Sequence, residues 1–323
     1  MRGLSKPAFT ILLAVCAAGM TVPSAAQDYP VKPVRIVTGD PGTMMDIVSR
    51  QLAQRLGALW GRSVVVENRG GFGNSTAHVS QAPPNGYTLL VADSGTLSIR
   101  PHLFRSLPYD PERDFAPIVL LASSPSFLVT HPSVPASNLP EFLAYAKRQP
   151  GGMHFATAGP WTNNHLTVEL FKRSSGLDIT PVNYKGGGAV MAAIVSGETK
   201  AAFSTPFMAL PHVKAGRIKA YAVTSGTRFA GAPEIPTMAE AGGEALVTNY
   251  WFGLLAPVRT PSALLNRINR EVIELLQSPA MKSALLEQGA EPGTGTPEEF
   301  RAFIRSETAR FGKAIEAAGI RAE

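Results

Sequence analysis

The stretch VRIVTGDPGTMMD at residues 34–46 constrains the fold more than any other part of the sequence. Its first five residues predict a short buried strand, and the following Gly-Asp-Pro-Gly predicts a tight turn. Thr43 is placed to cap a helix whose first turn contains Asp46. The backbone N–H groups at a helix start attract anions, and ligands of open α/β sheets bind at the carboxyl ends of strands. The stretch therefore indicates either a ligand loop or an ordinary strand-to-helix connection.

The same design returns later in the chain. His154–Ala156 predicts a strand, residues 157–164 (TAGPWTNN) a small-residue turn, and His165–Arg173 a helix. Two such helix starts, facing each other across a cleft, suit a two-lobed binding protein. A third glycine-rich turn, Tyr184–Gly188, precedes another helix, but no lysine and serine follow it as they do in a phosphate-binding loop.

Strands alternate with helices along the chain, which predicts helix-flanked parallel sheets. With 323 residues, of which 45% are hydrophobic and 17% charged, the chain is long enough for two cores. The residues Ser-Ser-Pro at 123–125 interrupt two apolar strands and are a plausible crossing point between the lobes. We expect an α/β fold with lobe 1 at residues 27–125 plus about 245–323, and lobe 2 at about 126–244.

The N-terminus has the pattern of a secretory signal peptide. Arg2 and Lys6 precede the apolar run Ala8–Met20, and the small residues at 24–26 offer a cleavage site near Ala26. No later apolar run approaches the roughly 20 residues of a membrane-spanning helix. We therefore expect residues 1–26 to be removed and the mature chain to be exported.

The only cysteine, Cys16, lies inside this leader. Its surroundings faintly resemble a lipoprotein acylation site, although the bulky Val15 argues against one. A mature chain without cysteine has no disulfides, thiolate metal sites or cysteine nucleophile. Removing the leader lowers the net charge from +6 to +4, and the basic residues are scattered. This charge weakly favours a small anionic ligand and argues against nucleic acid as a partner.

Signatures of catalysis and of cofactor binding are missing from the sequence. None of the six histidines has metal-ligand spacing, and the Gly-x-Ser-x-Gly motif of α/β-hydrolases does not occur. Asp40 and Asp46 belong to one loop, whereas the acids of glycosidases flank the substrate from separate elements. His165 is more often a structural hydrogen-bonding residue than a catalyst at such a helix start. Trp161 could stack on a ligand or fill the core, and Trp251 is expected in the core. We predict no enzyme, no cofactor and no metal.

Several motifs together resemble the Bug family, the solute-binding proteins of tripartite tricarboxylate transporters. The likeness covers essentially the whole mature chain in order. The motifs that carry it are Tyr29-Pro30-x-Lys32-Pro33-Val34-Arg35, Val64-Val65-Val66-Glu67-Asn68-Arg69, Asn85-Gly86-Tyr87-Thr88-Leu89-Leu90, Asn183-Tyr184-Lys185-Gly186-Gly187, Pro236-Thr237-x-Ala239-Glu240-Ala241-Gly242 and Trp251-Phe252-Gly253-Leu254.

This resemblance implies a periplasmic binding protein fold (type II-like) of two lobes, each with a helix-flanked, mainly parallel sheet. It implies a small carboxylate or amino acid held in the cleft and delivered to the membrane subunits of a tripartite transporter. A ligand-sensing periplasmic protein that signals to a membrane partner is the alternative. The expected ligand-binding residues are Asp40, Pro41, Gly42, Thr43, Asp46, Ala158, Gly159, Trp161, Thr162, His165, Gly186, Gly187 and Ser204.

The chain departs from the family pattern on two walls of the expected cleft. Asp40 and Thr43 stand where a small residue and a second glycine are typical, and Ser204 stands where an acid is frequent. An unpaired buried carboxylate is costly. We therefore expect Asp40 either to select a ligand with an amino or hydroxyl group beside its carboxylate, or to cap the helix.

Overall fold

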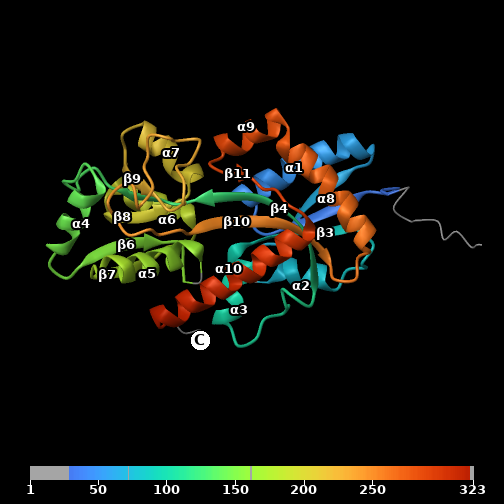
Figure 1. The fold of residues 1–323 in the computed structure, drawn as a ribbon, viewed down its shortest axis with the longest axis horizontal. Helices are drawn as coiled ribbons and strands as arrows, with labels where there is room; N and C mark the ends of the chain where they lie inside the picture. The colour runs from blue at the N-terminus through green and yellow to red at the C-terminus, as the bar shows by residue number, and fades with distance from the viewer. Residues whose placement is uncertain (1–28, 72, 161, 321–323) are drawn as a thin grey trace, which may run out of the picture.

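The structure is a computed structural model that describes residues 29–71, 73–160 and 162–320. Figure 1 shows two α/β lobes side by side, with long strands running from one lobe to the other. Each lobe contains one sheet with helices on both of its faces. The expected two-lobed α/β architecture is confirmed. Trp161 and the leader lie outside the described residues.

Lobe 1 contains a six-stranded sheet in the order β11-β4-β10-β3-β1-β2. Its strands are β1 (Val34–Thr38), β2 (Val64–Asn68), β3 (Thr88–Asp93), β4 (Phe115–Pro125), β10 (Asn249–Pro257) and β11 (Glu291–Pro292). Its helices are α1 (Met44–Trp60), α2 (Asn74–Ser80), the π-helix η1 (Gly95–Ile99), α3 (Arg100–Leu103), α8 (Ser262–Gln277), α9 (Pro279–Glu287) and α10 (Pro297–Ala318).

Lobe 2 contains a five-stranded sheet in the order β7-β6-β8-β5-β9. Its strands are β5 (Phe127–Thr130), β6 (Met153–Thr157), β7 (Ile179–Asn183), β8 (Ala201–Ser204) and β9 (Lys219–Val223). Its helices are α4 (Leu139–Lys147), α5 (Asn163–Ser175), α6 (Gly187–Ser196) and α7 (Pro206–Lys214).

Both sheets are mixed rather than mainly parallel. β1 pairs in parallel with β2 and β3, and β6 pairs in parallel with β7 and β8. The remaining pairs are antiparallel, because β4 leads out of lobe 1 while β10 leads back into it, and β5 and β9 run in opposite directions in lobe 2. The strand break expected at residues 123–125 does not occur, since these residues pair with Asn249–Trp251 of β10.

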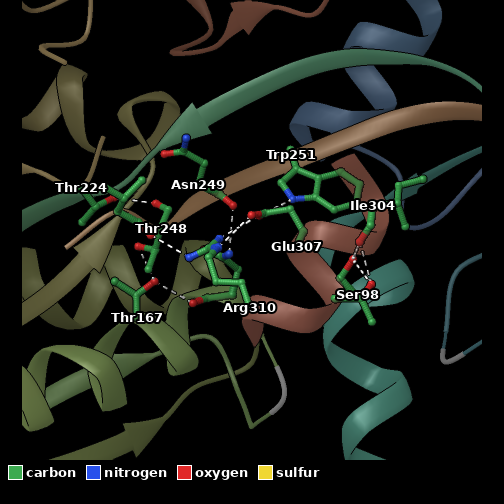
Figure 2. Close-up of polar contacts among 12 residues, drawn as sticks. Ser98, Thr167, Thr224, Thr248, Asn249, Trp251, Ile304, Glu307 and Arg310 are labelled. Carbon is green, nitrogen blue, oxygen red and sulfur yellow. Dashed lines mark hydrogen bonds and ion pairs between the residues drawn. The ribbon is translucent and has the colours of Figure 1, made fainter. Parts of the chain in front are cut away.

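Buried threonine hydroxyls connect the two segments in which the chain passes between the lobes, one between β4 and β5 and the other between β9 and β10. Thr224 Oγ1 accepts a hydrogen bond from the Ser126 N–H (2.9 Å) and donates to the Thr248 carbonyl (2.6 Å). The Thr248 N–H donates in turn to the Thr224 carbonyl (2.9 Å). From α5, Thr167 Oγ1 donates to Thr248 Oγ1 (3.0 Å), as Figure 2 shows. These hydrogen bonds thus connect the two crossing segments with each other and with α5 of lobe 2.

The helix α10 begins in lobe 1 and reaches across to lobe 2 (Figure 1). A capping box starts it, because Thr296 accepts from the Glu299 N–H while the Glu299 side chain accepts from the Thr296 N–H. Farther along, Glu307 accepts from the indole Nε1 of the fully buried Trp251 at 3.0 Å. Arg310 donates to Glu307 (2.7 Å) and to the Val247 carbonyl (2.8 Å) beside the crossing (Figure 2). Trp251 is a core residue, as expected.

The far end of α10 packs on α5 through an apolar cluster. The buried members of this cluster are Ile99, Leu103, Leu166, Phe311 and Ile315. Leu166 belongs to α5, whose first turn faces the space between the lobes, so one helix contacts both that space and α10. No helix within residues 29–71, 73–160 and 162–320 is both long and apolar enough to span a membrane.

Candidate functional site

The starts of four helices line one cavity of about 440 Å³ between the lobes. Thr43 caps α1 of lobe 1, while Thr162, Gly186 and Thr205 precede α5, α6 and α7 of lobe 2. Each helix start has N–H groups without an intrahelical partner and carries roughly half a positive charge. The convergence creates a positive potential that favours an anion, although no lysine or histidine lines the cavity in the part of the chain that the structure describes.

The residues that line this cavity come from both lobes. They are Pro41, Gly42, Thr43, Met44, Asp93, Gly95, Arg100, Ser126, Ala158, Thr162, Asn163, Asn164, Gly186, Gly187, Gly188, Val190, Phe203, Ser204, Thr205, Phe207, Met208 and Tyr250. The expected residues Pro41, Gly42, Thr43, Ala158, Thr162, Gly186, Gly187 and Ser204 are among them.

Asp46 does not line the cavity, but its carboxylate binds the loop of lobe 1 that does. Its buried carboxylate accepts from the Gly42 N–H (2.9 Å) and from Asn68 Nδ2 (2.8 Å), and Arg50 lies 3.0 Å away. Burial alone would raise the pKa of Asp46, but the hydrogen bonds from Asn68 and Gly42 and the Arg50 charge lower it. Gly42 has a positive φ of 75°, which an L side chain rarely adopts. An ionised carboxylate therefore stabilises the conformation of this loop.

Asn164 organises the corresponding loop of lobe 2. Its Oδ1 accepts from the Ala158 N–H at 2.8 Å, and its Nδ2 donates to the Phe203 carbonyl at the end of β8. Thr162 Oγ1 donates to the Gly159 carbonyl (2.9 Å) and accepts from the His165 N–H (3.2 Å). Gly159 itself is not among the lining residues. The turn is thus fixed to the adjacent strand before any ligand arrives.

His165 points away from the cavity, toward the apolar cluster of α10. It lines a separate small space with Leu166 and Ile315, and its Nδ1 is buried without a hydrogen-bond partner. Burial lowers the pKa of His165, while the charge of Glu169 and a hydrogen bond with Asn183 act in the opposite direction. The structure therefore places this residue in the packing between α5 and α10.

The lowered pKa of His165 predicts a loss of stability in mild acid. The unfolded chain binds a proton below the ordinary histidine pKa of about 6.5, whereas the folded chain binds it only at lower pH. The free energy of unfolding should therefore fall between pH 7 and pH 5. In urea titrations at both values, His165→Gln should reduce this fall, and His154→Gln, at an exposed position of β6, should not. An equal fall in His165→Gln would contradict the assignment.

Most of the other lining residues, among them the polar side chains of Asp93, Arg100 and Tyr250, were not predicted from the sequence. Asp93 ends β3 and accepts from the Thr96 N–H at 2.9 Å, and Arg100 donates to Thr96 Oγ1 at 3.4 Å. Burial raises the pKa of Tyr250, and the charge and hydrogen bonding of Asp93 raise it further, while Arg100 lowers it. A sequence signal for Asp93 is its place at the end of an apolar strand, because ligands of open α/β sheets bind at the carboxyl ends of strands.

Asp40 lies outside the large cavity. It lines a second, smaller chamber of about 140 Å³, and its side chain is largely exposed. The side-chain cap of α1 is Thr43, whose Oγ1 accepts from the Asp46 N–H at 3.3 Å. Within the described residues no group of three or more histidine, cysteine, aspartate or glutamate side chains could hold a metal ion.

Comparison with known proteins shows which family the chain resembles. A family model described as tripartite tricarboxylate transporter family receptor (TctC) matches residues 48–320. BugT of Bordetella pertussis is 33% identical over 309 residues, which cover 94% of this chain and 95% of that protein.

Solved structures agree with this match. A protein of R. palustris with adipate has a TM-score of 0.83 and 30% identity, and the match covers 91% of this chain and 100% of that one. MatC from Rhodopseudomonas palustris with bound malate has a TM-score of 0.77 and 28% identity, with 89% and 100% covered.

Proposed function

The chain belongs to the tripartite tricarboxylate transporter receptor family, and from that premise we propose that it captures a small carboxylate in the cavity between its lobes. The observation that carries the proposal is the convergence of four helix starts on one cavity. A carboxylate there would accept charge-assisted hydrogen bonds from backbone N–H groups. The adipate and malate of two similar proteins are carboxylates of a size that a cavity of about 440 Å³ accommodates.

The remaining parts of the proposal follow from the family and the leader. The chain acts in the periplasm after cleavage near Ala26, and it passes its ligand unchanged to the membrane subunits of a tripartite tricarboxylate-type transporter. The lobes extend over residues 27–125 with about 245–323, and over about 126–244. The ligand-binding residues are those of the predicted set that line the cavity, together with Asp93, Arg100 and Tyr250.

Calorimetric titration of the mature chain with matched ligands tests the proposal. Adipate and succinate should bind and give a measurable heat of binding, whereas adipamide, which has the length of adipate but no charge, should not bind. At 100 times its dissociation constant a carboxylate should stabilise the protein by about 2.7 kcal/mol in a thermal melt. The panel also contains monocarboxylates, amino acids and aromatic acids. If no acid of the panel binds, or if adipamide binds as tightly as adipate, the carboxylate proposal is overturned.

A further inference from the structure

Two chambers adjoin at the floor of the cleft. The smaller chamber, of about 140 Å³, lies within lobe 1 at the ends of β1 and β3, next to the turn that precedes α2. It shares the lining residues Thr43, Asp93, Arg100 and Tyr250 with the large cavity. Since a water molecule occupies about 30 Å³ in the liquid, the smaller chamber has room for several non-hydrogen atoms. A ligand held at the helix starts can therefore extend past Asp93 into a second space.

The charged side chains that line the two chambers differ. In the large cavity Asp93 and Arg100 balance each other, so the four helix starts leave it positive. In the smaller chamber Asp40 joins Asp93 and Arg100, so the lining contains two carboxylates and one guanidinium, and Thr43 at the start of α1 also belongs to it. Because of the added carboxylate, the smaller chamber favours a cationic group more than the large cavity does. A second carboxylate on the ligand would instead face both Asp40 and Asp93.

Asp93 is held in place at the shared wall. Its Oδ1 accepts from the Thr96 N–H at 2.9 Å, and Tyr250 hydrogen-bonds to its side chain. The carboxylate is thereby oriented by groups from η1 and β10. Asp40 is more exposed, so water screens its charge more strongly. Of the two acids, Asp93 should therefore have the larger effect on a ligand.

We propose that the smaller chamber is a subsite for an amino group, and that the ligand is an amino-substituted carboxylate. Its anionic end lies at the four helix starts, and its cationic end lies against Asp93 and Asp40. This inference rests on the proposed carboxylate capture, because it assumes that the anionic end is bound in the large cavity.

Calorimetry at pH 7 with three ligands of equal carbon number tests the proposal. The ligands are 5-aminopentanoate, glutarate and pentanoate, and the four-carbon and six-carbon series repeat the test at other lengths. In the series whose length fits the two chambers best, the amino acid should bind about tenfold or more tightly than the matched dicarboxylate and monocarboxylate.

Two variants and a control locate the effect. Asp93→Asn should abolish the preference for the amino ligand, while Asp40→Asn should reduce it by a smaller factor. Asp178→Asn, an exposed acid of lobe 2, should leave the preference unchanged. Far-ultraviolet circular dichroism and melting of each variant establish that it is folded, and Asp40→Asn provides a second test if Asp93→Asn does not fold.

The possible failures are distinguishable. If glutarate or pentanoate binds the wild type as well as 5-aminopentanoate does, and the other two lengths agree, the amino subsite is overturned and carboxylate capture stands. A preference that survives in both Asp93→Asn and Asp40→Asn would overturn the subsite as well. If no ligand of any series binds, both proposals are overturned.

Discussion

Replacement of Gly187 by leucine should abolish carboxylate binding and leave the protein folded. Gly187 is the first residue of α6, and it lines the large cavity. A Cβ added there would meet only Met208, at the ordinary distance of 3.9 Å, and Met208 lines the same cavity. The leucine side chain would therefore fill ligand space and cover N–H groups at the start of α6. We expect the affinity for the tightest-binding carboxylate to fall by about 100-fold or more, because a filled pocket excludes the ligand and its helix contacts.

A matched glycine provides the control for this experiment. Gly226 has nothing within 4 Å of an added Cβ, and it lies in an exposed turn outside the cavity. Gly226→Leu should bind carboxylates as the wild type does. Both variants should melt near the wild-type temperature in the absence of ligand. Wild-type affinity in Gly187→Leu would mean that the ligand does not occupy the cavity at the start of α6.

Truncation of Glu307 to alanine should lower the free energy of unfolding by about 2 to 3 kcal/mol. The change leaves the indole N–H of Trp251 buried without a partner, and it leaves Arg310 without its carboxylate. A fully buried ion pair that loses one partner costs about 3 to 5 kcal/mol. The expected value is smaller because 37% of the Arg310 side chain is exposed, so that water can still solvate the guanidinium.

Urea titration followed by tryptophan fluorescence measures this effect, since Trp251 itself reports on the site. Glu316→Ala, at an exposed position of the same helix, is the matched control and should change stability by less than about 0.5 kcal/mol. Glu307→Gln, which can still accept from the indole, should fall between the two. If Glu307→Ala were as stable as the control, α10 would not be anchored through Trp251.

Local sequence patterns predicted the helix starts but not the floor of the cleft. Thr43 and Thr162 were identifiable because a cap, a preceding turn and an apolar strand are neighbours in sequence. Tyr250 reaches Asp93 through the antiparallel pairing of β10 with β3, more than 150 residues away. Arg100 follows a π-helix that no pattern indicated. Contacts of this kind depend on strand order, which periodicity does not encode.

The direction of strands was predicted less well than their positions. β4 continues through residues 123–125 although serine and proline are poor strand residues, because these residues pair with β10.

His165 was expected at the ligand because it stands at the start of a helix that lines the cleft, and the structure contains this helix start. The side chain of His165, however, lies about 100° farther around α5 than that of Asn164, which lines the cavity, and it is on the face that packs on α10.

The place of β10 in the middle of the lobe 1 sheet has a consequence for the order of assembly. It separates β3 from β4, and these two strands are not paired with each other. A nascent or truncated chain that ends before residue 249 therefore has two halves of a sheet without their joining strand. Lobe 1 can complete its core only after the whole of lobe 2 has been synthesised, although most of lobe 1 comes first in the chain.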